Sequence, residues 1–363
     1  MVFLLFFYLI FMNMSCIVYK DLNRRTVMVH VVLDAMGGDN APKEIVKGAL
    51  KALGQSGEIK VTLCGRTSEI EEELKGSQYP SDRLAILDAT EVISTEEAPV
   101  MAIRRKKDSS IVKGMNLIKE GQADAFVSAG SSGAILVGGQ LIVGRIKGVE
   151  RPPLAPLIPS TTQRGVSLLI DCGANVDARS SHLVQFAKMG SIYMEHVLGV
   201  RNPRVAIVNI GAEEEKGNML VKETYPLLSN CPDINFVGSI EAREIPNGGA
   251  DVIVCEAFVG NVILKMYEGV GKMMLSTIKG ALMSSMRGKL GGLLIKPSLK
   301  GVMKTFDATE YGGAPLLGLN GLVVKVHGNA TEKEICNAIR QCETFKEQNI
   351  SQRIADKIII KDE

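Results

Sequence analysis

The chain has 363 residues, 46% of them hydrophobic, enough to bury a large core in one α/β domain or in two fused subdomains. A formal net charge of only +2 excludes the strong basic field with which a protein holds a nucleic-acid backbone. The 7 cysteines form no Cys-x-x-Cys pair and the 4 histidines lack metal-ligand spacing, so no disulfide framework, metal or cofactor is expected and a cytoplasmic location fits.

Residues 1–27 begin with an apolar run over residues 2–12. The run is shorter than the roughly 20 residues of a spanning helix, and no Lys or Arg precedes it as in a signal peptide. Because Met28 stands directly before the first expected strand, we interpret residues 1–27 as an over-long start assignment, with an apolar anchor as the alternative. A single α/β catalytic domain is expected over residues 28–357.

The first expected strand ends in a glycine-rich turn. Asp34 closes an apolar run, Gly37, Gly38 and Asp39 follow, and Pro42 fits the first turn of a helix. Paired glycines let a ligand approach backbone N–H groups, and the N-terminus of a helix favours an anion. This order predicts an anion-binding loop, and a turn without a ligand is the alternative.

Strands and helices then alternate. Strands are predicted at residues 59–63, 84–87 and 125–127, and helices at residues 68–75 and 109–120. Such alternation predicts a mainly parallel sheet that helices cover, with ligands at the carboxyl ends of its strands.

A second glycine-rich turn follows the strand at residues 125–127. It contains Ser128, Gly130, Ser131, Ser132 and Gly133. The serine hydroxyls add donors that suit a phosphate or a thioester carbonyl, and the alternative for each serine is a helix N-cap.

The proline-rich stretch at residues 151–159 cannot form a central helix, so a change of subdomain is expected there. A buried strand at residues 166–170 follows. It ends in a third polar loop, which carries Asn175, Asp177 and Arg179.

His182 comes next, and its position at a helix start indicates a cap or packing residue more than a catalytic base. Strands at residues 205–210 and 252–254 follow, and the second leads into a helix with Asn261 and Lys265. Lys265 lies one turn after Asn261 on the same face, where its ammonium group can reach an anion above the helix start.

Residues 265–304 form a basic, amphipathic helical segment. Its eight basic residues face one acidic residue, Glu268, and its apolar residues are mostly Met and Leu; the basic residues are Lys265, Lys272, Lys279, Arg287, Lys289, Lys296, Lys300 and Lys304. This composition predicts contact with an anionic membrane surface or an acidic partner protein, and a dimer or core helix is the alternative.

Polar and glycine residues also surround the last predicted strand, at residues 322–326. Glu310, Gly312 and Gly313 lie in a loop before it, and Asn320 occupies the turn that leads into it.

The same strand ends at His327, and a final helix follows. Thr331 and Glu334 have the spacing of a capping box, and the apolar residues after them lie on one helix face, so this helix is expected to be structural.

Taken in chain order, these loops resemble the family of bacterial phosphate acyltransferases, which make acyl-phosphate from an acyl carrier protein thioester and inorganic phosphate. The matching motifs are LDAMGGD at 33–39, SAG at 128–130 with GA at 133–134, GANVD at 173–177, GNV at 260–262 with Lys265, EYGGAPLLG at 310–318, NG at 320–321 and HG at 327–328. The resemblance extends from about Val29 to the last helix. The chain departs from the family's usual residues at Ser131, Ser132 and Arg179, and Cys172 replaces an apolar residue, which speaks against a cysteine nucleophile.

The resemblance implies a three-layer α/β/α sandwich, similar to phosphotransacetylase and isocitrate dehydrogenase-like folds and usually dimeric. It also implies direct attack of a phosphate oxygen on the thioester carbonyl, with no acyl-enzyme, so that positioning and electrostatic stabilisation provide the catalysis.

The resemblance and the loops together assign the candidate site residues. Lys265 and Arg179 would neutralise phosphate, and Asn175 and Asn261 would donate to phosphate or the oxyanion. Asp34, Asp39, Asp177 or His327 would orient donors or take a proton. The expected catalytic residues are Lys265, Asn261, Asn175, Asp177, Asp34 and His327, and the expected substrate-binding residues are Gly37, Gly38, Asp39, Ser128, Gly130, Ser131, Ser132, Gly133, Arg179, Glu310, Gly312, Gly313 and Asn320.

The implied role is phospholipid synthesis. The expected partners are acyl carrier protein, inorganic phosphate, a second copy of the chain, an anionic membrane surface and a downstream glycerol-phosphate acyltransferase. An acetyl- or butyryltransferase that uses coenzyme A thioesters is the alternative enzyme, and a non-catalytic membrane-surface scaffold is the alternative outside enzymes. A dehydrogenase is disfavoured because the chain has no GxGxxG fingerprint.

Overall fold

The computed structural model describes residues 28–305 and 308–358, without the side chains of residues 297–309. Its strands form two sheets. The predicted start assignment at residues 1–27 lies outside these described residues. The first sheet has six strands, in the order β10 (Ala314–Leu316), β11 (Leu322–Lys325), β4 (Ala125–Ser128), β1 (Val29–Asp34), β2 (Ile59–Gly65) and β3 (Leu84–Asp88). The second has five, in the order β5 (Leu157–Pro159), β6 (Val166–Ile170), β9 (Val252–Val254), β7 (Arg204–Val208) and β8 (Asn235–Ile240).

Most strand pairs are parallel. Only the edge strands β10 and β5 pair antiparallel to their neighbours. The central strands are almost continuous runs of Val, Ile and Leu because helices cover both faces of a parallel sheet. The predicted α/β fold with mainly parallel strands is confirmed, and the structure divides those strands between two sheets.

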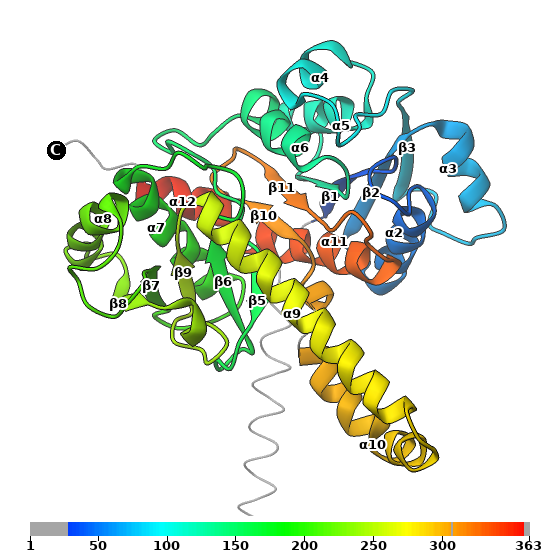
Figure 1. Ribbon diagram of the computed structural model, residues 1–363. Helices are drawn as coiled ribbons and strands as arrows, with labels where there is room; N and C mark the ends of the chain where they lie inside the picture. The colour runs from blue at the N-terminus through cyan, green and yellow to red at the C-terminus, as the bar shows by residue number, and fades with distance from the viewer. Residues whose placement is uncertain (1–27, 306–307, 359–363) are drawn as a thin grey trace, which may run out of the picture.

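Helices cover both faces of the first sheet (Figure 1). The helices α2 (Lys43–Gln55) and α11 (Glu332–Glu347) pack on one face, and α4 (Pro99–Arg105), α5 (Ser110–Lys119) and α6 (Ser132–Gly138) lie over the other. The remaining elements near this sheet are α3 (Thr67–Leu74), the π-helical turn η1 (Gly139–Val143) and the 3₁₀ turn η3 (Ala308–Tyr311). Each long helix follows an apolar stripe: in α2 the buried residues include Ile45, Ala49 and Leu53, as the helical spacing predicts.

Around the second sheet lie α7 (Ser180–His196), α8 (Met219–Ser229), α12 (Ile350–Ile358) and the 3₁₀ turn η2 (Ala242–Glu244). The chain enters this sheet through the proline-rich residues 151–159, where the sequence predicts a change of subdomain, and returns to the first sheet with β10. One continuous hydrophobic core contains buried side chains of both sheets, including Leu33 and Leu168. The prediction of one catalytic domain over residues 28–357 stays a prediction.

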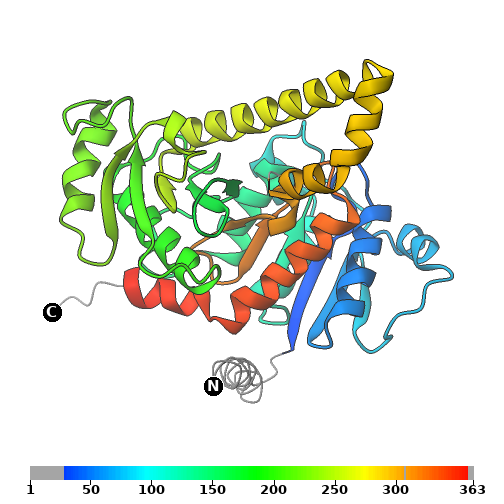
Figure 2. The same ribbon diagram turned by 90° about the horizontal axis from the view of Figure 1, so that it is seen from below.

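Two helices extend away from both sheets (Figures 1 and 2). They are α9 (Ala257–Met283) and α10 (Met286–Thr305), and we call the pair the helical hairpin. In α9 only Ala257 and Gly260 are buried. In the part of the chain that the structure describes, no helix is long and apolar enough to cross a membrane.

Two local predictions are wrong. The strand predicted at residues 205–210 ends at Val208, because the side chain of Asn209 accepts a hydrogen bond from the Ile210 N–H and so begins a turn. The Thr331 half of the predicted capping box is not formed: this N-cap side chain makes no cap bond, and the Glu332 N–H donates instead to Glu44 of α2, at 2.9 Å.

Candidate active site

The carboxyl ends of β1, β4 and β11 lie side by side, because these strands are neighbours in the first sheet. The Asp39 N–H donates to the Gly328 carbonyl at 2.7 Å, which joins the loops after β1 and β11. Ser128 Oγ donates to Asp34 Oδ2 at 2.6 Å, which joins the ends of β4 and β1. The sheet therefore assembles three loops that are far apart in the sequence.

Asp34 holds the first glycine loop in place. Its carboxylate accepts a hydrogen bond from the Met36 N–H at 3.1 Å, and burial raises the pKa of this carboxyl group. A Cβ at Gly37 would stand 2.3 Å from Asp34 Oδ2, so only glycine fits there. Asp34 is 1% exposed, and its carboxylate contacts the loop and Ser128; its predicted catalytic role stays a prediction.

The loop after β6 is organised in the same way by Asp171. Its carboxylate accepts hydrogen bonds from the N–H groups of Leu154, Ala174 and Asn175 and from Asn175 Nδ2. Burial is the largest effect on this group and raises its pKa to about 6. Asn175 Nδ2 also donates to the Pro152 carbonyl, so both hydrogens of this amide are engaged within the protein. Asn175 therefore holds the loop, and the predicted donor to phosphate or oxyanion is occupied.

Helix α9 connects the two sheets. It begins where the Ala257 N–H donates to the Asn175 carbonyl at 3.2 Å, and Gly260 lies so close to β6 that a Cβ would stand 1.9 Å from the Asp171 carbonyl oxygen. Further along, Glu268 Oε2 lies 3.0 Å from Lys265 Nζ and 3.8 Å from His327 Nε2. Lys265, Glu268 and His327 form what we call the α9 bridge, which ties the helix of one sheet to the strand end of the other.

The α9 bridge changes the protonation of its members. His327, and then Lys265, lower the pKa of Glu268 to about 2, while Glu268 raises the pKa of His327 above its ordinary value. Both effects favour the charged forms. The bridge therefore sets the ammonium group of Lys265 and an imidazole of raised pKa on either side of the Glu268 carboxylate.

The other predicted site residues lie at different ends of the two sheets. Asn261, Asp177 and Arg179 are exposed at the end of the second sheet where α9 begins. Gly313 lies at the carboxyl end of β11, since a Cβ there would stand 2.6 Å from the Lys325 carbonyl oxygen. Asn320 lies at the opposite, amino end of β11, where its N–H donates to the Gly144 carbonyl, so the structure does not bring it to the loops.

Ser131 is the N-cap of α6, and its hydroxyl accepts the Ala134 N–H at 3.4 Å, which is the alternative that the sequence left open. Ser132 is exposed in the first turn of the same helix. Gly133 is packed beside Pro99, where a Cβ would stand 2.5 Å from the ring. Gly130 donates its N–H to Ser128 Oγ.

Two more predicted positions have structural partners. His182 is a cap: its Nδ1 accepts the Arg179 N–H at 3.1 Å, and its Nε2 lies 3.1 Å from Glu150. Glu310 pairs with Lys333 of α11 at 2.8 Å, and Gly312 adopts a positive φ in the turn beside it.

Sequence reasoning missed three charged residues: Asp171, Glu268 and Lys325. Asp171 and Lys325 end apolar strands, and a charged residue at the carboxyl end of a buried strand is the signal that could have identified them. Glu268 is the single acidic residue of the basic segment at residues 265–304, which is a second signal that the sequence contains. Cys172 is buried and its pKa is raised well above the ordinary thiol value, so it is a poor nucleophile, as expected.

Two surface cavities, of about 340 and 260 Å³, lie away from these loops. The larger is lined by residues that include Arg204 and Val237, and the smaller by residues that include Tyr193 and Arg340. Neither is lined by Gly37, Gly38 or the α9 bridge, but the smaller one is lined by Glu310, one of the predicted substrate-binding residues.

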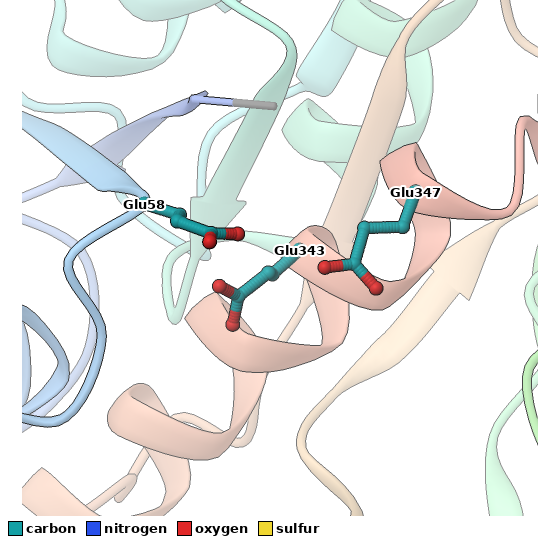
Figure 3. Close-up of side chains that lie close together, drawn as sticks. All are labelled: Glu58, Glu343 and Glu347. Carbon is teal, nitrogen blue, oxygen red and sulfur yellow. The ribbon is translucent and has the colours of Figure 1, made fainter. Parts of the chain in front are cut away.

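A cluster of three carboxylates lies elsewhere (Figure 3). The oxygens of Glu58, Glu343 and Glu347 lie within 4.8 Å of one another, and Ser56 Oγ donates to Glu343 at 2.7 Å. Glu58 precedes β2, so the cluster lies at the amino end of the first sheet, opposite the loops. It takes no part in the candidate site.

The family model described as "Fatty acid synthesis protein" matches residues 29–353. A phosphate acyltransferase of Clostridium botulinum is 52% identical over 325 residues, which cover 89% of this chain and 97% of that protein. A phosphate acyltransferase of Clostridium tetani is 47% identical over 329 residues, covering 91% and 98%.

Solved structures show the same fold. A phosphotransacetylase from Streptococcus pyogenes superposes with a TM-score of 0.57 at 18% identity, covering 89% of this chain and 97% of that one. A branched-chain phosphotransacylase from Enterococcus faecalis has a TM-score of 0.51 at 14% identity, with coverage of 87% and 98%. These likenesses agree with the predicted phosphotransacetylase-like sandwich.

Proposed function

Because the chain belongs to the phosphate acyltransferase family, we propose that it transfers an acyl group from an acyl carrier protein thioester to inorganic phosphate, for phospholipid synthesis. The observation that carries this proposal is the α9 bridge, which sets Lys265 and His327 beside the loops that contain Gly37 and Gly38. A cation beside a glycine loop at a strand end suits a phosphate. Direct attack by phosphate needs no nucleophile from the protein.

In the proposed reaction a phosphate oxygen attacks the thioester carbonyl carbon, and the carbonyl oxygen becomes an oxyanion. The new C–O bond is kept when the C–S bond breaks, and the carrier leaves as a thiolate that takes up a proton. Lys265 neutralises the phosphate, and the glycine-loop N–H groups and Asn261 donate to phosphate or the oxyanion. Asp34 and Asn175 hold the two loops in shape.

The test is a phosphate-dependent assay that compares acyl carrier protein and coenzyme A thioesters of the same acyl chain, with acyl-phosphate trapped by hydroxylamine. We expect acyl-phosphate from the carrier-protein thioester. Preference for the coenzyme A thioester would favour the acetyl- or butyryltransferase alternative. Absence of acyl-phosphate with both donors would favour the non-catalytic scaffold.

The role of Lys265 is tested in the same assay. We expect Lys265→Ala to lower kcat/KM for phosphate by about 10- to 100-fold, because a charge-assisted contact to phosphate is lost. Lys222→Ala removes an exposed lysine from α8 and is the matched control. Normal phosphate saturation and turnover in Lys265→Ala would exclude this role.

The helical hairpin supports a second part of the proposal, contact with an anionic membrane surface. Its exposed side chains include Met286, 81% exposed, and Leu294, 75% exposed. Lys272, Lys279, Arg287, Lys289 and Lys296 are exposed on the same two helices; the side chains of Lys300 and Lys304 lie outside the described residues. Apolar side chains flanked by basic ones match an anionic lipid surface. Acyl carrier protein, a second copy and a glycerol-phosphate acyltransferase remain proposed partners.

A further inference from the structure

Three polar side chains lie in one row across adjacent strands of the first sheet. Lys325, the last residue of β11, is in register with Ser128, the last residue of β4. Ser128 in turn donates to Asp34, the last residue of β1, at 2.6 Å. Neighbouring strands are about 4.8 Å apart, so Lys325 stands directly beside the paired ends that carry the glycine loops.

Lys325 is a half-buried lysine at the end of β11. Among the residues that the structure describes, its Nζ is in no ion pair, and it donates only to the carbonyl of Val326. Lysines that leave the solvent are normally paired, because burial of an uncompensated charge is costly. Asp34, the carboxylate in the same row, already accepts from Ser128 and Met36.

The charges around Lys325 come from four elements. They are Glu334 of α11, Lys265 of α9, Asp34 of β1 and Asp39 of the first loop. Burial lowers the pKa of Lys325 more than the three carboxylates raise it, so that the pKa is about 8. An anion bound beside the ammonium group would offset this effect and keep the lysine charged.

Two glycines pack closely against the end of β11 and the loop that follows it. A Cβ at Gly313 would stand 2.6 Å from the Lys325 carbonyl oxygen, and a Cβ at Gly38 would stand 2.7 Å from the Gly328 carbonyl oxygen. The end of β11 thus packs closely against Gly313, which precedes β10, and the loop after β11 packs closely against the first glycine loop. Lys325 therefore lies at the strand end from which the loop after β11 begins.

We propose that Lys325 is a further phosphate-binding residue, whose ammonium group contacts the inorganic phosphate held by the loops after β1 and β11. In the reaction it would neutralise the phosphate from the sheet side, while Lys265 acts from α9. The kinetic part of this inference rests on the proposed function, whereas the binding of phosphate to the protein does not.

The first experiment measures phosphate saturation in the full chain. We expect Lys325→Met to raise the KM for phosphate by about 10- to 100-fold with a smaller change in the KM for the thioester. Lys325→Arg should recover part of the loss because it keeps the charge. Lys60→Met removes a lysine from the amino end of β2, in the same sheet but away from the loops, and should behave as the parent.

The pH dependence separates a phosphate contact from a structural role. As the pH rises through about 8, the parent loses the Lys325 charge and its KM for phosphate should rise. Lys325→Arg should lack this rise, because arginine stays protonated in this range. If Lys325→Met does not fold, the comparison of the parent with Lys325→Arg still tests the inference. The inference would be overturned if the KM for phosphate depended on pH identically in these two proteins.

The second experiment measures the melting temperature with and without inorganic phosphate. We expect phosphate to stabilise the parent and Lys60→Met more than Lys325→Met. This result would support the site even if the parent forms no acyl-phosphate, in which case only the proposed function fails. Equal stabilisation of the parent and Lys325→Met, no stabilisation of the parent, or an unchanged phosphate KM in a folded Lys325→Met would overturn it.

Discussion

Asp34 and Asp171 have the same structural role, one in each sheet. Each is the first polar residue after a buried apolar run, and each accepts hydrogen bonds from the loop that follows it. A carboxylate accepts several N–H and O–H bonds at once, which fixes a loop that would otherwise lose its shape. At both positions burial raises the pKa, whereas the hydrogen bonds from the neighbouring loops lower it and so favour the charged carboxylate.

His327 offers a residue-level test of the α9 bridge. Glu268 raises the pKa of His327, and Glu268 itself titrates near 2 instead of 4.5. The attraction therefore contributes to stability most between about pH 4.5 and 6.5; it declines as the pH rises through the pKa of folded His327 and as it falls toward that of Glu268. In Glu268→Gln we expect the NMR titration midpoint of His327 to fall toward 6.5.

The same spectra contain their control. His196 belongs to α7 and its pKa is lowered, first by burial and then by Arg353, with no contribution from Glu268. Its midpoint should be the same in the parent and in Glu268→Gln. An unchanged midpoint for His327 in the variant would show that the bridge does not form in solution.

At the scale of elements, the contact between α9 and β6 depends on one glycine. A Cβ at Gly260 would stand 1.9 Å from the Asp171 carbonyl oxygen, so we expect Gly260→Ala to destabilise the fold by about 2 kcal/mol or more, measured by urea unfolding. Gly269→Ala is the control, because nothing lies within 4 Å of a Cβ there. It should be neutral or stabilising by up to about 1 kcal/mol, since alanine favours helix. Equal effects of both substitutions would contradict the close packing.

The helical hairpin is expected to bind anionic lipid surfaces. We expect the full chain to co-sediment with phosphatidylglycerol vesicles more than with phosphatidylcholine vesicles, and less at high salt. Substitution of both Leu293 and Leu294 by Glu should weaken sedimentation, because it adds charge to exposed apolar positions. Ile210→Glu, at a 79% exposed position after β7, is the control.

Two other results would assign the hairpin differently. If the leucine variant sediments with vesicles as the parent does but elutes as a smaller species in size-exclusion chromatography, the hairpin is an interface between two copies. If it loses only the binding of acyl carrier protein, the hairpin binds the carrier. Both results would contradict the membrane assignment.

At the scale of the whole molecule, the site depends on how two sheets are joined. The chain leaves the first sheet at the proline-rich stretch, builds the second, and returns through the hairpin to β10 and β11 (Figure 2). This return places β11 beside β4, nearly two hundred residues earlier in the chain. The loops after β1, β4 and β11 can therefore act on one ligand only after the last part of the chain has docked.

Local patterns in the sequence predict the α/β class, the glycine turns and the helix faces, and the resemblance predicts the family. Apolar runs, helical spacing and strand-end glycines are local patterns, and residues 166–170 and 252–254 form strands with the predicted bounds. Which strand ends are neighbours became known from the order of the strands in the folded sheets. It engages the amide of Asn175 inside the fold, places Asn320 at the far end of β11, and brings Glu268 and Lys325 to the loops. Spacing along a chain shows which face of an element is buried, whereas sheet order and hydrogen-bond partners follow from the packing of all elements together.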